Sequence, residues 1–268
     1  MKIGIFDSGL GGLIITRAIS KIMPEYDYVY LGDTKRAPYG NKSRKAVLEF
    51  TKKAVDYLFC KENCAIIIIA CDTALAQALR AIQREYLPKN FRERKVLGVL
   101  IPTTEIASNH KTVGILATSG TIASNTWAVE IKKLNSKTKV FQNPAPMLVS
   151  LIEEGDNILA KPFLLKYLKP FMNKKLDTLV LGCTHYPILK REIKKIMPQK
   201  IKIISQDEII PKKLKEYFAR HEEIVKKLSR NGTVKILVTD KTQNINFLVK
   251  KWFGRHSVNT ISDSLLSL

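Results

Sequence analysis

The amino-acid sequence predicts an α/β protein with two pseudo-symmetric domains, each built on a mostly parallel sheet. Short apolar runs alternate with longer amphipathic stretches along almost all of the 268 residues, as expected for strands that alternate with helices. Two segments, Ile66–Thr73 and Leu179–His185, each contain aliphatic residues, a small residue, Cys, a polar residue and then Thr or His. These matching strand ends predict an active site in the cleft between the domains.

An internal repeat supports the prediction of two related domains. The segment from Gly4 to Gly9 begins the first half, and the segment from Gly114 to Ser119 resembles it. Cys71 and Cys183 follow these segments at nearly the same spacing. If the two halves pack about a pseudo-twofold axis, the two cysteines approach one cleft from opposite sides.

Each element is predicted from its own residue pattern. Strands are expected where aliphatic and β-branched residues are contiguous, and helices where apolar residues recur every three or four positions. Gly11 and Gly12 are expected to form a tight turn before the first helix. The predicted strands are 2–6, 27–31, 65–70, 95–100, 112–117, 138–141, 178–181, 201–204 and 234–239. The predicted helices are 13–22, 42–59, 74–85, 122–134, 162–171, 188–196, 210–228 and 244–253.

The domain boundaries follow from the repeat. Its midpoint falls near residues 97–102, where a strand-like run reaches Pro102. The residues after 206 contain no cysteine, and we expect their strand and two helices to return to the first domain. We therefore predict a first domain of residues 1–97 plus 207–268 and a second domain of residues 98–206.

Composition excludes several classes of protein. A hydrophobic content of 45% is typical of a globular chain with a real core. No secretory signal is visible after Met1, and the longest apolar run, Cys64–Cys71, is far shorter than the ~20 residues of a membrane helix. Four cysteines in a chain of this size do not indicate a disulfide framework, and Cys60 and Cys64 lack a second ligand pair at metal spacing. We expect a cytoplasmic protein without membrane contact or a metal site.

The chain is strongly basic, with 45 Lys and Arg against 24 Asp and Glu and a formal net charge of +21. Such a charge steers anionic small molecules and leaves nucleic acid open as a partner. The lysines are dispersed beside apolar residues in helical patterns, however, which is typical of solvated helix faces. No nucleic-acid-binding motif accompanies the charge.

Cys71 and Cys183 are the candidate acid–base residues. A free thiol has a pKa of ~8.5 and needs help to ionise. Each cysteine is predicted to end a strand and start a helix, where unpaired N–H groups favour a thiolate and can also bind a carboxylate. Thr73 and Thr184 can supply helix N-caps or hydroxyl donors. One cysteine at the end of a buried strand is more often structural, whereas two at matching positions favour catalysis.

Two further features have competing interpretations. His185 is suited to donate or relay a proton, although a histidine at a helix start is often only structural. Gly9, Gly11 and Gly12 resemble a dinucleotide-binding loop, but the third glycine of that motif is missing and no acidic residue ends the next predicted strand. A nucleotide site in this loop is therefore not expected.

Five motifs resemble the glutamate racemase family of the aspartate/glutamate racemase superfamily, and the likeness covers nearly the whole chain. That resemblance implies two Rossmann-like domains around the substrate, catalysis without a cofactor, and production of D-glutamate for peptidoglycan. It leaves a homodimer open. The motifs are Asp7-Ser8-Gly9-Leu10-Gly11-Gly12, Gly32-Asp33-Thr34, Pro38-Tyr39-Gly40, Ala70-Cys71-Asp72-Thr73-Ala74 and Leu181-Gly182-Cys183-Thr184-His185-Tyr186-Pro187.

The resemblance also implies roles for individual residues. Cys71 and Cys183 would be the two bases, assisted by Asp7 and His185. Glu153 resembles a carboxylate near the second cysteine. The residues that would bind glutamate are Asp7, Ser8, Pro38, Tyr39, Gly40, Asp72, Thr73, Thr118, Thr121, Glu153, Thr184 and His185.

One departure from the pattern of the family bears on the chemistry of the site. Its first cysteine motif is normally Cys-Asn-Thr, and Asp72 stands at the middle position here. An ionised Asp can only accept hydrogen bonds, so it would repel a substrate carboxylate and could instead bind the ammonium group.

The resulting hypothesis is racemisation of glutamate by two bases, in which one thiolate removes the α-proton and the other thiol returns a proton to the opposite face. A second hypothesis keeps the chemistry and changes the substrate to aspartate or another amino acid, with Asp72 as the reason. The resemblance favours glutamate, because related aspartate enzymes carry an acidic residue where His185 stands. A third hypothesis is a nucleic-acid-binding or regulatory protein on the same fold, and it rests on the net charge.

Overall fold

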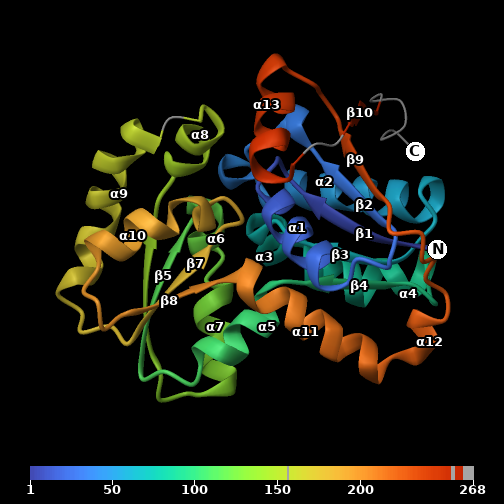
Figure 1. Cartoon of the computed structure of the whole chain (residues 1–268). Coiled ribbons are helices and arrows are strands. Elements are labelled where there is room, and N and C mark those ends of the chain that lie inside the picture. Colours follow the sequence, from blue (N-terminus) through green and yellow to red (C-terminus); the bar gives the residue numbers. More distant parts are fainter. Residues whose placement is uncertain (156, 255–256, 262–268) are drawn as a thin grey trace.

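The computed structural model describes residues 1–155, 157–254 and 257–261, whose strands form two parallel sheets (Figure 1). The six-stranded sheet has the order β10-β9-β2-β1-β3-β4, and the four-stranded sheet has the order β6-β5-β7-β8. We call the first sheet and its helices the first lobe, and the second sheet and its helices the second lobe. The strands are β1 Lys2–Asp7, β2 Tyr28–Gly32, β3 Cys64–Ile69, β4 Lys95–Gly98, β5 Thr112–Ala117, β6 Lys139–Pro144, β7 Thr178–Gly182, β8 Lys202–Ser205, β9 Val234–Val238 and β10 Val258–Thr260.

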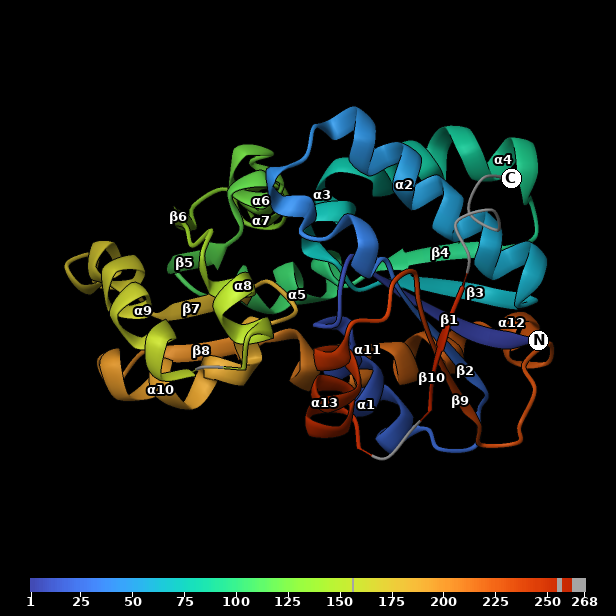
Figure 2. The same ribbon diagram turned by 90° about the horizontal axis from the view of Figure 1, so that it is seen from above.

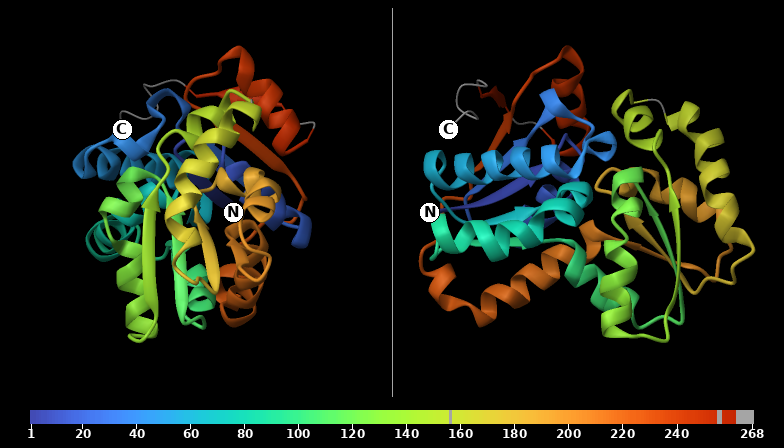
Figure 3. Two further views of the ribbon diagram at one scale, coloured as in Figure 1. Left: turned by 90° about the vertical axis from the view of Figure 1, so that its left-hand side faces the viewer. Right: turned by 180° about the vertical axis from the view of Figure 1, so that it is seen from behind.

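Helices cover both faces of the sheets, so the central strands are buried and nearly continuously apolar, as in β3. In the first lobe α2 and α3 lie on one face, and α1, α11 and α13 lie on the other (Figure 2). Figure 3 shows from behind how α11, which follows β8, returns along the first lobe. The helices are α1 Gly12–Ile22, α2 Arg44–Asp56, α3 Asp72–Ala81, α4 Leu87–Asn90, α5 Leu100–Ala107, α6 Ser119–Ala123, α7 Thr126–Leu134, α8 Leu148–Glu153, α9 Asn157–Met172, α10 Lys190–Ile196, α11 Gln206–Arg220, α12 Glu222–Val225 and α13 Gln243–Trp252.

The two sheets share one topology, which positions the site. In the first, β1 lies between β2 and β3, and in the second, β5 lies between β6 and β7. The chain leaves β1 toward β2 and leaves β3 toward β4 in the opposite direction, and it does the same from β5 and β7. The positions between β1 and β3 and between β5 and β7 are therefore the switch points at which open parallel sheets bind ligands beyond the carboxyl ends of the strands. The predicted pseudo-symmetric α/β fold is confirmed.

Several elements differ from the prediction. β10, α5 and α8 were not predicted; α5 buries one face, but two of its buried residues are Thr103 and Thr104 while Ile101 is exposed, so its sequence lacks an amphipathic pattern. The helix expected at 210–228 begins at Gln206 and ends where His221 leaves the helical conformation. β9 and β10 join the first sheet, whereas the domain boundaries after residues 97 and 206 stay predictions. Among the described residues, no helix is long and apolar enough to cross a membrane.

Candidate active site

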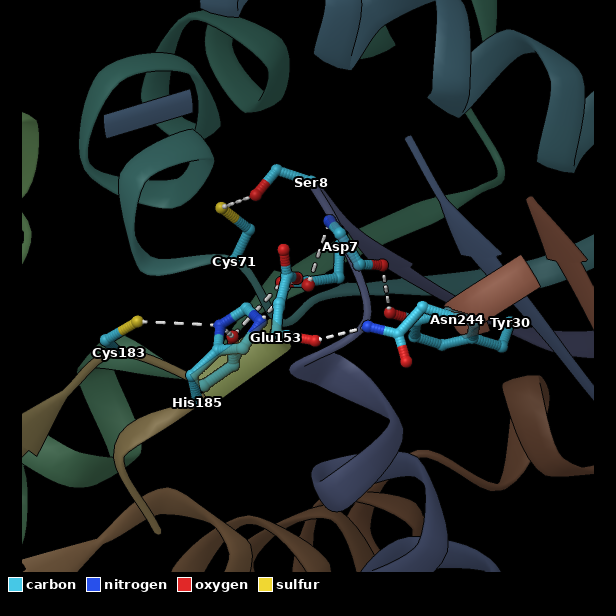
Figure 4. Close-up of polar contacts among 10 residues, drawn as sticks. Asp7, Ser8, Tyr30, Cys71, Glu153, Cys183, His185 and Asn244 are labelled. Carbon is cyan, nitrogen blue, oxygen red and sulfur yellow. Dashed lines mark hydrogen bonds and ion pairs between the residues drawn. The ribbon is translucent and has the colours of Figure 1, made fainter. Parts of the chain in front are cut away.

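Cys71 and Cys183 follow β3 and β7, which occupy equivalent places in the two sheets. Both side chains are buried, and both line one cavity of about 30 Å³ between the lobes. A water molecule needs ~10–15 Å³ of such space, so the cavity has room for only about two or three waters. Figure 4 shows the two thiols reaching this region from different elements, Cys71 beside Ser8 and Cys183 beside His185.

The surroundings of Cys71 favour the neutral thiol. Its sulfur caps α3, accepting from the backbone N–H of Ala74 at 3.4 Å, and its S–H donates to Oγ of Ser8 at 3.1 Å. Burial raises the pKa of Cys71, and the nearby Asp7 carboxylate raises this pKa further. The two hydrogen bonds oppose these effects without outweighing them.

The surroundings of Cys183 are different, because they include a cation. Its sulfur lies 3.8 Å from Nδ1 of His185, and Nε2 of the same ring lies 2.8 Å from Oε1 of Glu153. Burial alone would lower the pKa of His185, but hydrogen bonds to Cys183 and Glu153 raise it well above its usual value. Burial raises the pKa of Cys183, while His185 lowers it. Cys183 is therefore the thiol whose anion is better stabilised.

Asp7 lies at the end of β1, fully buried beside the cavity. Its carboxylate accepts hydrogen bonds from the backbone N–H of Gly9 at 3.2 Å and from the hydroxyl of Thr184 at 3.4 Å. Tyr30 fixes the same loop, because its hydroxyl donates to the carbonyl of Gly9 at 2.7 Å. Burial raises the pKa of Asp7, and the His185 charge opposes that rise.

Three threonine hydroxyls join the two lobes at the cavity. Thr73 of α3 lies 2.9 Å from Thr118 and 3.3 Å from Thr121, measured between hydroxyl oxygens. Thr118 caps the short helix α6 and lies 2.9 Å from Thr121. These hydroxyls can turn toward a bound carboxylate, since each can donate one hydrogen bond.

The loop after β2 closes the cavity from the first lobe. The hydroxyl of Tyr39 donates to Asp33, and Asp33 is also held by Arg36 and by the hydroxyl of Thr239 at 2.9 Å. This network fixes the tyrosine ring, and burial raises the pKa of its phenol. Gly40 packs against Thr118 of the second lobe.

Twelve of the fourteen residues predicted for the site line this one cavity. Asp7 and Thr121 are not in its lining; they are fully buried behind Thr184 and Thr118, to which they bond. Among the described residues of the lining, none is Lys or Arg, despite the basic chain. The twelve are Ser8, Pro38, Tyr39, Gly40, Cys71, Asp72, Thr73, Thr118, Glu153, Cys183, Thr184 and His185.

A second cavity is larger, about 330 Å³, and lies where α3, α5 and α11 meet. Its charged residues include Glu105 and Lys213, which pair at 2.9 Å. Among the described residues that line this second cavity there is no Cys or His. It is therefore a poorer candidate for proton transfer than the cavity between Cys71 and Cys183, although it is larger.

Comparisons with known proteins agree with this geometry. The model of the Asp/Glu/hydantoin racemase family matches residues 13–209. A glutamate racemase of Sulfurihydrogenibium sp. is 39% identical over 95% of this chain and 94% of its own length, and one of Aquifex aeolicus is 35% identical over 100% of both. The crystal structure of glutamate racemase from Francisella tularensis in complex with D-glutamate has a TM-score of 0.89 at 32% identity, covering 100% of this chain and 98% of that one. The chain belongs to the Asp/Glu/hydantoin racemase family.

This membership confirms the predictions of a family resemblance and of a racemase enzyme. Two details of this racemase differ from expectation. Cys183 is not followed directly by an α-helix but by a short 3₁₀ turn, Tyr186–Leu189, whose dipole is small, so His185 supplies the positive charge there. Of the two roles expected for Thr73 and Thr184, neither residue caps a helix; their hydroxyls instead form hydrogen bonds, to Thr118 and to Asp7.

The structure of this racemase adds residues that sequence reasoning missed. Nδ2 of Asn244, in α13, donates to the backbone carbonyl of Glu153 at 2.7 Å and so ties the first lobe to the end of α8 (Figure 4). Nε2 of Gln206, the first residue of α11, donates to Oδ1 of Asp72 at 2.8 Å. Burial raises the pKa of Asp72 to about 8, although this hydrogen bond lowers it. These partners lie far apart in sequence, and no local pattern marks them.

Proposed function

We propose that this racemase interconverts L-glutamate and D-glutamate by a two-base mechanism without a cofactor. The observation that carries the proposal is that Cys71 and Cys183 reach one cavity from equivalent strand ends of two pseudo-symmetric lobes. The glutamate racemases similar to this chain, one of them bound to D-glutamate, support the choice of substrate.

In the proposed reaction one thiolate removes the α-proton of the amino acid, and the thiol on the other side delivers a proton to the opposite face. Asp7 accepts the proton released by Cys71, and neutral His185 accepts at Nδ1 the proton released by Cys183, which forms the thiolate–imidazolium pair. Burial raises the pKa of Asp7, and its ability to accept a proton rises accordingly. The paired His185 and Glu153 stabilise the thiolate of Cys183.

The negative charge that develops on the substrate needs fixed hydrogen-bond donors. The hydroxyls of Thr73, Thr118 and Thr184 and the N–H groups at the start of α3 are in place to supply them. The small cavity must widen to admit glutamate and then close, which would exclude water from the reacting carbon. We further propose that the enzyme acts in the cytoplasm and supplies D-glutamate to peptidoglycan.

Racemisation of L-glutamate by the purified protein without added cofactor tests the proposal. Cys71→Ser and Cys183→Ser should each lose at least about 100-fold in rate, because each removes one acid–base group. In deuterium oxide, solvent deuterium should enter the product that has inverted. Full activity in either variant would exclude the two-base scheme. A parallel assay with L-aspartate decides between the two substrates: faster D-aspartate formation would replace glutamate by aspartate.

A further inference from the structure

The contact between Asp72 and Gln206 leaves two oxygens without partners. Nε2 of Gln206 donates to Oδ1 of Asp72 at 2.8 Å. Oδ2 of Asp72 and Oε1 of Gln206 are both buried, and neither has a hydrogen-bond partner among the described residues. An ionised carboxylate and an amide oxygen are both acceptors, so they cannot satisfy each other. One proton placed between them would satisfy both.

We propose that the Asp72 carboxyl group is protonated at neutral pH and forms a cyclic pair of hydrogen bonds with the Gln206 amide, so that it presents a neutral carboxylic acid to the substrate. In this pair the amide N–H donates to Oδ1, and the acid O–H donates to Oε1 of the amide. The inference rests on the proposed function for its consequence in binding, but the protonation itself does not depend on that function.

The surroundings of Asp72 favour the neutral form. Asp72 and Gln206 are 3% and 1% exposed. The titratable groups that face Asp72 are Asp7 from β1 and Cys183 and Tyr186 after β7, and an anion on any of them opposes a second negative charge. Cys71 precedes Asp72 as the N-cap of α3, and Asp207 follows Gln206 in α11. Lys190 bonds to Ser205 and Glu208, on either side of Gln206.

A neutral Asp72 also fits the charge of the substrate. Glutamate carries two carboxylates and one ammonium group at neutral pH, and the described cavity lining contains no Lys or Arg. His185 can carry a positive charge there, but Glu153 pairs with it. An ionised Asp72 beside Asp7 would repel the substrate. The pKa of about 8 that burial gives Asp72 agrees with a protonated acid at neutral pH.

Infrared difference spectroscopy of the full chain without substrate tests the protonation directly. At pH 7 the wild-type protein should show a carbonyl band of a protonated carboxylic acid that is missing in Asp72→Asn, and the band should disappear as the pH rises through about 8. Asp207→Asn is the matched control, since Asp207 also has a buried oxygen without a partner. Circular dichroism verifies that each variant is folded.

Steady-state kinetics test whether protonation of Asp72 controls the binding of glutamate. If only the neutral acid binds glutamate, the KM of the wild type rises about tenfold per pH unit above the pKa of Asp72. Asp72→Asn cannot ionise, so its KM should lack this rise, while other titrations affect both proteins alike. A band that survives in Asp72→Asn, or that disappears in Asp207→Asn, would overturn the proposal. If the carboxylic acid band is present but neither L-glutamate nor L-aspartate is racemised, the proposed function fails and the protonated pair of Asp72 and Gln206 stands.

Discussion

Gly11 and His185 meet across the two lobes at a distance that excludes a side chain on Gly11. A Cβ atom on Gly11 would stand 2.5 Å from Nδ1 of His185 and 2.5 Å from Oγ1 of Thr184. The backbone of Gly11 is right-handed, at φ −59° and ψ −34°, so its conformation suits any residue. The glycine is therefore required by the approach of the second lobe and not by the turn.

Gly11→Ala should consequently impair catalysis without weakening the first lobe. The added methyl group displaces His185 or holds the lobes apart, and such overpacking costs about 1–3 kcal/mol, which corresponds to roughly a 5- to 150-fold loss of kcat/KM. Thermal unfolding should change little, because alanine also reduces the entropy of the unfolded chain. Lys21→Ala, exposed in the last turn of α1, is the control for activity. If Gly11→Ala kept the kcat/KM of the wild type, the close contact between Gly11 and His185 would not be required for catalysis.

Glu153→Gln should shift the pH dependence of the reaction to lower pH. Glu153 helps to raise the pKa of His185, so its loss lowers that pKa and leaves the Cys183 thiolate without its cation at alkaline pH. We expect kcat to fall about 10- to 100-fold, and the decrease of kcat at alkaline pH to begin at a lower pH than in the wild type. Glu154→Gln, at the exposed neighbouring position, is the control.

The same variant should lose stability in one pH range. A histidine with a raised pKa in the folded state contributes stability that is fully present below its unfolded pKa of ~6.5 and is lost as the pH rises through the folded value. The difference in unfolding free energy between wild type and Glu153→Gln should therefore be largest near pH 6 and should decrease at higher pH. Denaturant unfolding at several pH values measures it, and a difference that grows with pH would contradict the pairing.

The two thiols should differ in reactivity. Cys183 has His185 beside it, whereas Cys71 has the Asp7 carboxylate, so the thiolate of Cys183 forms at lower pH. With the exposed Cys60 replaced by serine, iodoacetamide should label Cys183 before Cys71, as measured by peptide mass spectrometry across pH 7–10. Faster labelling of Cys71 would reverse the assignment of the stronger base.

Much of the fold was predictable because buried parallel strands are visible in the sequence as contiguous aliphatic runs. The aliphatic run of β3 is followed by Ala70 and Cys71, and β7 is followed in the same manner by Cys183, so the residue pattern alone locates both cysteines directly after strands. The meeting of those ends follows from the repeated topology. β10 was missed because its three residues carry no such run.

The supporting residues of the site were not predictable from local pattern. Asn244 and Gln206 act through single side-chain hydrogen bonds to partners that are distant in sequence, Glu153 and Asp72. A polar residue at a helix start or on a helix face is ordinary in a solvated helix, so nothing in the pattern distinguishes these two. Only the return of α11 and α13 to the first lobe brings them to the site.

Asn244→Ala should impair catalysis as well as stability. The lost hydrogen bond joins α13 to the backbone of Glu153, and bonds of this kind contribute about 0.5–1.5 kcal/mol to stability. Because Glu153 orients His185, we expect kcat to fall roughly in proportion, about two- to tenfold. Asn246→Ala, exposed on the same helix, should have no effect on either property. Equal kinetics for the two variants would show that this contact does not position Glu153.

Asp27 should control the stability of the first lobe in acid. It is buried, and although burial alone would raise its pKa, hydrogen bonds from Ser229, Thr233 and Asn231 hold it well below the usual range. A carboxylate with a depressed folded pKa contributes stability that is present above its unfolded pKa of ~3.9 and is lost as the pH falls.

Asp27→Asn should therefore destabilise the protein by about 1–3 kcal/mol at pH 7. The amide oxygen can still accept from the N–H and the hydroxyl of Thr233, but the amide NH2 group would face Nδ2 of Asn231, which donates to Oδ2 of the carboxylate at 2.7 Å. The difference from wild type should narrow as the pH approaches 3, where the wild-type carboxylate begins to lose its advantage. Urea unfolding at pH 7, 4 and 3 measures this trend, with exposed Asp240→Asn as the matched control. A constant difference across that range would mean that Asp27 stabilises β2 and β9 by packing and not by its charge.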